Sequence, residues 1–107
     1  NKVIEIKNIR NVNLIVNCTP VGMYPAINMT PLKDVNMINT DCVVDIIYNP
    51  DETVLMKKYM ERNVKAVNGL IMLIFQAIKS EEIWNDEKYD DEILQKIHEE
   101  LSEKLYK

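Results

Sequence analysis

Short runs of apolar residues alternate with amphipathic stretches along this chain. Residues 3–6, 14–16, 42–47 and 64–67 are short and mostly apolar, and most are bounded by polar or turn-forming residues, which predicts four strands. The stretch at 42–47 is apolar at nearly every position apart from Asp45, as is typical of a strand buried on both faces of a parallel sheet. Between the second and third strands, the prolines in residues 19–34 predict a long loop.

The third strand is followed by a predicted helix. Asn49 can cap its start, Pro50 suits the first helical position, and Glu52 completes a start that resembles a capping box. Apolar and long side chains then follow helical spacing to Asn63, which we expect to be the C-cap.

Two more helices are predicted after the fourth strand. One opens at Asn68-Gly69 and runs to about Trp84, and it is apolar around most of its circumference, so we expect it to be buried. The other begins at a cap provided by Asp90 and carries one apolar stripe opposite an acidic face. Alternating strands and helices predict the α/β class, with half of a Rossmann-like doubly wound parallel sheet and helices after it.

Charge and glycine content limit the function. The chain has 107 residues with a net charge of -4, and residues 79–107 hold ten acidic and five basic residues, whereas residues 1–78 are nearly balanced. An acidic tail argues against nucleic acid or an anionic membrane as a partner. There are only two glycines, where average usage of about 7% predicts roughly seven, so the chain holds no glycine-rich phosphate loop of its own.

Cysteine usage and apolar run lengths favour a cytoplasmic protein. Cys18 and Cys42 flank apolar runs and are expected to be buried thiols in a reducing compartment, and their spacing does not suit a zinc site. No metal site is expected. No charged-then-apolar leader opens the sequence, and the longest apolar run, residues 70–75, is too short to cross a bilayer.

Candidate chemistry lies in three loops that leave the carboxyl ends of predicted strands, the edge at which ligands bind in a parallel sheet. These loops are residues 17–25, 45–50 and 68–76. In the third loop, Gly69, Met72 and Gln76 fall on one helix face, where they offer a bare backbone, a soft apolar group and an amide. Such a face suits a flat heterocycle with a polar substrate beside it.

The three loops also resemble a known family. Asn-x-Thr-Pro-x-Gly-Met, then Val-Val-Asp-x-x-Tyr-Asn-Pro-x-x-Thr, then Asn-Gly-Leu-x-Met-Leu-x-x-Gln-Ala are similar to the C-terminal part of shikimate dehydrogenases, in order and spacing, over residues 14–84. That family reduces 3-dehydroshikimate to shikimate with NADPH in aromatic amino acid biosynthesis. The resemblance implies an oxidoreductase segment, with residues 1–84 as the C-terminal part of an NADP-binding Rossmann domain, including the helix that faces the substrate domain. Residues 85–107 would form an acidic amphipathic C-terminal helix.

The resemblance also implies roles for individual residues. Ile46, Gly69 and Met72 match positions around the nicotinamide, and Thr19 lies in the loop under that half of the cofactor. Hydride transfer requires a ring held by its amide, with one face backed by apolar groups and the other open to the substrate carbonyl.

Two positions match the substrate side of the family's site. Tyr48 matches a residue beside bound shikimate, and Gln76 matches a glutamine that hydrogen-bonds it. In contrast to many relatives, the chain has Ile71 where they have a glycine. The family's catalytic lysine and aspartate belong to an N-terminal substrate domain with no counterpart here, so no catalytic residue is expected in this segment and the segment alone should be inactive.

Structural interpretations stay open for the same residues. Tyr48 can close the end of a strand, Gln76 can be a satisfied helix amide, and Met72 can fill a core. The two glycines can serve backbone geometry alone. For Asp45 a structural hydrogen bond is the preferred interpretation, because no catalytic partner is evident.

Two other functions also stay open: a quinate-accepting dehydrogenase relative, and a non-catalytic Rossmann-like fragment that acts through protein contacts. For the isolated segment, exposed apolar sheet faces predict self-association, so this chain is also expected to form a homo-oligomer. The choice between NADP and NAD is not fixed by these loops.

Overall fold

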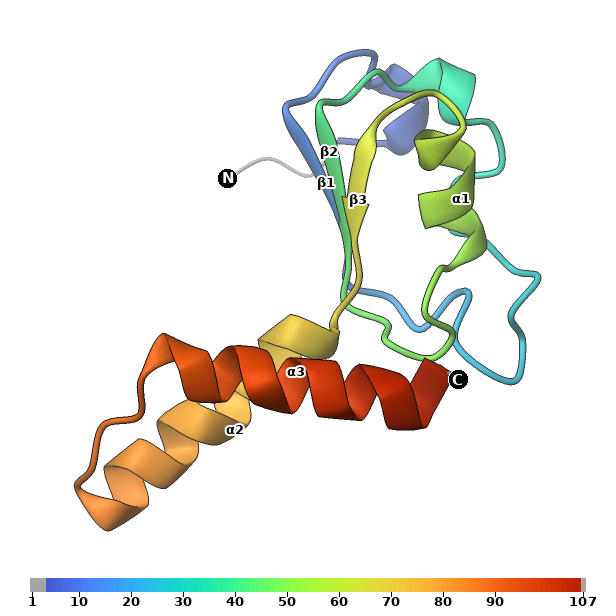
Figure 1. Cartoon of the computed structure of the whole chain (residues 1–107). Coiled ribbons are helices and arrows are strands. Elements are labelled where there is room, and N and C mark those ends of the chain that lie inside the picture. The colour runs from blue at the N-terminus through green and yellow to red at the C-terminus, as the bar shows by residue number, and fades with distance from the viewer. Residues whose placement is uncertain (1–3, 107) are drawn as a thin grey trace. The chain divides into compact units, whose positions relative to one another are not determined.

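The computed structural model describes residues 4–106, and these divide into two compact units, Asn1–Asn68 and Gly69–Lys107. The first unit contains a three-stranded parallel sheet with strand order β1-β2-β3 (Figure 1). The strands are β1 (Leu14–Asn17), β2 (Cys42–Asp45) and β3 (Lys65–Val67). The predicted α/β class and parallel sheet are therefore confirmed, and the division into residues 1–84 and 85–107 stays a prediction.

One face of this sheet is covered by the helix α1 (Val54–Met60), which contacts β2 and β3. The register pairs Ile15 with Val43 and Val43 with Ala66, and these side chains all point toward the core. Leu14 and Val16 alternate to the other face of the sheet and are about half exposed. For the run at 42–47, to which the prediction of burial on both faces applies, Val43 and Asp45 are buried, whereas Cys42 and Val44 on the other face are only half-buried.

A short 3-10 helix and one tyrosine also contribute side chains to the core of the first unit. The 3-10 helix η2 (Val35–Met37) is capped by the side chain of Asp34, which accepts a hydrogen bond from the Asn36 amide. Tyr59, on α1, is fully buried and donates from its hydroxyl to the Ile38 carbonyl at 2.9 Å. The long loop predicted at 19–34 is confirmed, since it holds no helix or strand.

The first predicted strand is wrong. Among its residues, Ile4 and Glu5 are not in a strand, and Ile6 begins a 3-10 helix, η1 (Ile6–Asn8); Val3 lies outside the described residues. A strand needs a neighbour for its backbone hydrogen bonds, and the sheet contains only three strands among the described residues.

The predicted start of α1 is also wrong. The helix begins four residues later than Pro50, and its N-cap is Thr53, whose hydroxyl accepts a hydrogen bond from the Met56 amide at 3.3 Å. The Asn49–Pro50 peptide bond is cis and belongs to the preceding loop. The predicted C-cap is wrong as well, because the helix ends at Met60 with Glu61 as its C-cap, and Asn63 adopts the left-handed conformation, with φ +62°, two residues later.

The second unit consists of two helices, α2 (Leu70–Asn85) and α3 (Asp91–Tyr106), which pack against each other. Both predicted helices are confirmed, as is the cap of the second, because the Asp90 carboxylate accepts from the Ile93 amide at 3.1 Å. The prediction that the first is buried is wrong, because only Leu70 and Ile74 are buried on α2. Its exposed large apolar side chains are Met72, Leu73, Phe75, Ile83 and Trp84. Over residues 4–106, no helix combines the length and hydropathy needed to cross a membrane.

Candidate functional site

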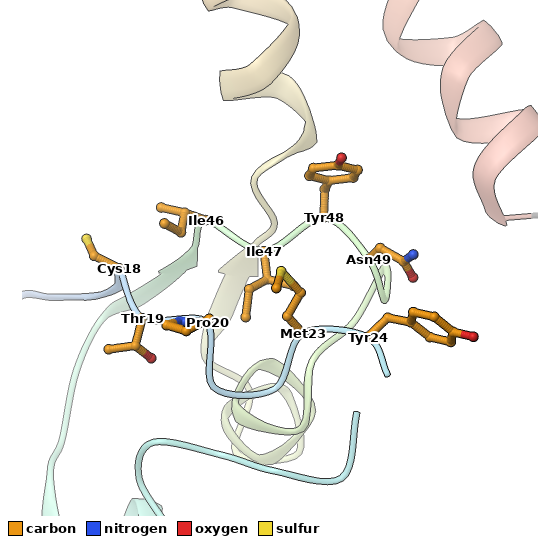
Figure 2. Close-up of a pocket in the computed structure, with 9 residues that line it drawn as sticks. All are labelled: Cys18, Thr19, Pro20, Met23, Tyr24, Ile46, Ile47, Tyr48 and Asn49. Atoms are coloured by element: carbon orange, nitrogen blue, oxygen red, sulfur yellow. The ribbon is translucent and has the colours of Figure 1, made fainter. Parts of the chain in front are cut away.

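A pocket of about 390 Å³ lies where the loops after β1 and β2 meet, at the carboxyl edge of the sheet. Its lining comes from these two loops, which lie beside each other (Figure 2). The residues that line it are Cys18, Thr19, Pro20, Met23, Tyr24, Ile46, Ile47, Tyr48 and Asn49. A concave, mainly apolar site with a few polar groups at this edge of a parallel sheet is the usual setting for a bound ligand.

Three of the six residues implicated by the sequence line this pocket. Thr19 comes from the loop after β1, whereas Ile46 and Tyr48 follow β2 directly. In Figure 2, Ile46 lies toward one side of the pocket with Cys18, and Tyr48 lies toward the other side. The sequence thus located two loops that are far apart in the chain and adjacent in space.

Gly69, Met72 and Gln76 belong to the second unit. Gly69 is buried and is the N-cap residue of α2, directly after β3 and Asn68. Met72 is 49% exposed, and Gln76 is also exposed, with its backbone carbonyl accepting from the Ser80 hydroxyl at 3.0 Å. Their spacing of three and four residues places Met72 and Gln76 on the same side of the helix that Gly69 opens.

A buried polar cluster is hydrogen-bonded to both pocket loops. Asp45, the last residue of β2, is fully buried and accepts hydrogen bonds from the Asn17 amide, the Ile47 backbone amide and the Thr53 hydroxyl. The structural interpretation of Asp45 is therefore confirmed. Among the described residues, no buried side-chain nitrogen or oxygen lacks a hydrogen-bond partner.

The turn in the first loop depends on Gly22. Its φ is +102°, a conformation that other residues rarely adopt, and a Cβ at this position would lie 2.9 Å from the Met29 carbonyl oxygen. Gly22 therefore has a backbone role in the loop after β1, in agreement with the structural interpretation from sequence.

Cys18 differs from its prediction. It is exposed and lines the pocket, whereas Cys42 is half-buried, and both are free thiols. The apolar run before Cys18 suggested burial, but β1 ends at Asn17 and Cys18 already belongs to the loop. No group of three metal-ligating side chains gathers in the part of the chain that the structure describes.

Sequence reasoning did not assign a site role to the other six pocket residues, which are Cys18, Pro20, Met23, Tyr24, Ile47 and Asn49. All six lie inside the two loops that the motifs mark, so their places in the sequence were the available signal. Tyr24 is held there by its backbone amide, which donates to the Asn49 carbonyl at 2.9 Å and ties one loop to the other.

Similarity to known proteins is strong over most of the chain. A shikimate dehydrogenase (NADP+) from Clostridium perfringens is 40% identical over 97 residues, which are 91% of this chain and 36% of that protein. The chain therefore spans about a third of the length of the curated relatives that it matches. No protein-family model matches it.

Solved structures agree with the sequence comparison. A chorismate mutase/shikimate 5-dehydrogenase fusion protein from Clostridium acetobutylicum matches with a TM-score of 0.85 and 46% identity, over 94% of this chain and 36% of that one. A shikimate dehydrogenase in complex with NADP+ matches with a TM-score of 0.76 and 37% identity, over 90% of this chain and 33% of that one. The resemblance indicated by the three motifs is thereby confirmed: this chain is similar to a Rossmann-like segment of shikimate dehydrogenases, about one third of their length.

Proposed function

We propose that this chain is the C-terminal part of an NADP-dependent shikimate dehydrogenase, which reduces 3-dehydroshikimate to shikimate in the cytoplasm. The observation that carries the proposal is the pocket at the carboxyl edge of the sheet, because it joins two of the three matched motifs at one ligand-sized site. The third motif follows β3, whose carboxyl end lies at the same edge of the parallel sheet.

The chain's contribution to the cofactor site would be the nicotinamide half. Bound NADPH would supply the hydride that goes to the carbonyl carbon of the substrate. The apolar lining at Ile46 suits one face of a flat ring, and the pocket volume of about 390 Å³ lies within the usual range for ligand-binding pockets. In this proposal Thr19 lies under that half of the cofactor, Met72 backs the ring, and the Gly69 backbone meets its amide.

The substrate side of the proposal rests on two polar side chains. Tyr48 would bind shikimate through its hydroxyl, and Gln76 would hydrogen-bond it through its amide. The proton for the new hydroxyl group would come from a lysine–aspartate pair of the kind that the family carries in its substrate domain. The segment would then position both reactants without itself supplying the acid or base.

The test uses the whole protein that carries this segment. Shikimate-dependent reduction of NADP+ is followed by absorbance, with Tyr48→Phe and Gln76→Ala as variants. Each removes a substrate hydrogen bond, so kcat/KM for shikimate should fall about ten-fold or more.

Matched controls are Tyr89→Phe and Gln95→Ala, which make the same chemical changes outside the pocket. Both should keep the kinetics of the unaltered protein. Unchanged kinetics for both Tyr48→Phe and Gln76→Ala would contradict the site assignment. A higher kcat/KM for quinate than for shikimate would contradict the assignment of shikimate as the substrate.

A further inference from the structure

Beyond the residues that line the pocket, three buried polar side chains form one connected cluster. Asn17, Asp45 and Thr53 are each at most 4% exposed, and they come from the end of β1, the end of β2 and the start of α1. We propose that this cluster, hereafter the Asp45 cluster, consists of positioning residues that hold the two pocket loops in the geometry needed to bind substrate and cofactor. The proposal rests on the function proposed above.

The sheet register brings the first two members together. Asn17 pairs with Asp45 across β1 and β2, so their side chains point to the same face of the sheet. The Asn17 amide nitrogen lies 3.2 Å from both carboxylate oxygens of Asp45. Burying two polar side chains at strand ends costs free energy unless they form hydrogen bonds, and Asn17 and Asp45 form them with each other.

The loop after β1 is attached through Asn17. Its amide oxygen accepts from the Thr19 backbone amide at 3.0 Å and from the Thr19 hydroxyl at 2.7 Å. Its amide nitrogen also donates to the Val21 carbonyl at 3.4 Å. Asn17 therefore sets the path of the chain through Thr19, one of the residues that line the pocket from this loop.

The loop after β2 is attached through Asp45. One carboxylate oxygen accepts from the Ile47 backbone amide at 3.1 Å, between the pocket residues Ile46 and Tyr48. The other accepts from the Thr53 hydroxyl at 2.8 Å, and Thr53 in turn caps α1. A single carboxylate therefore fixes this loop at both of its ends.

Among the described residues, two backbone hydrogen bonds connect the chain segment from Asn17 to Tyr24 with the loop after β2. The Ile46 amide donates to the Asn17 carbonyl at 3.1 Å near the sheet, and the Tyr24 amide donates to the Asn49 carbonyl at 2.9 Å at the far side. Between these places, the Asp45 cluster links the loops through side chains. A carboxylate is suited to this position because its two oxygens accept four of the hydrogen bonds and it carries no donor to conflict with the Ile47 amide.

The key variants are Asp45→Asn and Thr53→Val, in the whole protein. An asparagine side chain replaces one acceptor oxygen with a donor, so at least one of the donors around residue 45 loses its partner. Valine keeps the shape of threonine and removes the link between α1 and Asp45. Thr53→Ser restores the hydroxyl, and Asp34→Asn makes the Asp-to-Asn change at an exposed cap outside the pocket.

The first readout is hydrogen–deuterium exchange of the ligand-free protein, which does not depend on the proposed function. Asp45→Asn and Thr53→Val should raise amide exchange at residues 18–24 and 46–49 by about ten-fold or more, while α3 stays unchanged. Thr53→Ser and Asp34→Asn should match the unaltered protein. Unchanged exchange in the two loops, or an equal rise throughout the chain, would overturn the proposal.

The second readout is the steady-state kinetics of the folded variants. Loosened loops should lower kcat/KM for shikimate about ten-fold, with restoration by Thr53→Ser. Normal kinetics despite loosened loops would also overturn the proposal. If the unaltered protein does not oxidise shikimate, the proposed function fails, while the exchange experiment still decides whether the cluster holds the loops. Unfolding of both Asp45→Asn and Thr53→Val under the assay conditions would contradict a role confined to the loops.

Discussion

The two units of this chain bury their apolar side chains to different degrees. In the first unit, Val43 and Tyr59 are completely buried at the centre of a core cluster that includes side chains from all three strands and α1. In the second unit, no described residue of α3 is buried, and Trp84 at the end of α2 is 76% exposed. The sheet unit therefore carries its own core, whereas most large apolar side chains of α2 have no such cover. A stable sheet is what the pocket needs, because both of its loops start from strand ends.

The largest expected effect of a substitution is in the core of the sheet unit. Leu55 on α1 is 1% exposed and belongs to the core cluster. Leu55→Ala removes buried methyl groups and leaves a cavity, so the free energy of unfolding should fall by about 2–5 kcal/mol. Urea denaturation measures this change, and a loss below about 1 kcal/mol would show that the sheet unit lacks the tight core described here.

A smaller effect, with a distinct pH dependence, is expected at Tyr59. Tyr59→Phe leaves the buried Ile38 carbonyl without its donor, which should cost about 1–3 kcal/mol at neutral pH. Burial raises the pKa of the Tyr59 hydroxyl above its usual value of 10.0, and the charge of Arg62 partly opposes that rise.

The sign of the pH effect follows from this shift. The stability linked to the Tyr59 hydroxyl is complete below pH 10.0, the ordinary pKa, and is lost as the pH rises through the folded-state pKa above it. The unaltered protein should therefore lose stability more steeply above that pH than Tyr59→Phe does. Urea denaturation across this range tests the difference, and parallel pH profiles would contradict it. Tyr24→Phe, at a side chain that is 64% exposed, is the control at neutral pH.

The smallest effect is expected in the helical unit. Trp84→Ala removes a large side chain that is mostly exposed, so the free energy of unfolding should change by no more than about 0.5 kcal/mol in this segment. A loss of several kcal/mol in the whole protein, measured in the same way, would show that another part of that protein covers this side chain. That result would show that the apolar side chains of the helical unit are buried by contacts with the rest of the whole protein.

The sequence predicted elements well where local patterns and tertiary packing agree. The apolar runs at β1 and β2 and the Asp90 cap of α3 are confirmed for that reason. The predicted start of α1 is wrong because the sequence shows a local capping pattern at Asn49. In the structure, Thr53 is the cap, and its hydroxyl also donates to the buried Asp45, a tertiary hydrogen bond that no local pattern reveals.

The candidate site was only partly predictable for a similar reason. The motifs located Thr19, Ile46 and Tyr48, which line one pocket. They did not show that Cys18 is exposed there, since its exposure depends on the residue at which β1 ends. The link from Asn17 to Asp45 was equally hidden, because 28 residues separate them and only the sheet register brings them together.

The most direct test of the central claim is a crystal structure of the whole protein with NADP+ and shikimate bound. The nicotinamide should lie against Ile46 and the start of α2 at Gly69, with shikimate on the Tyr48 hydroxyl and the Gln76 amide. Ligands bound elsewhere, with the pocket between the loops after β1 and β2 empty, would contradict the assignment of this pocket as the nicotinamide and substrate site.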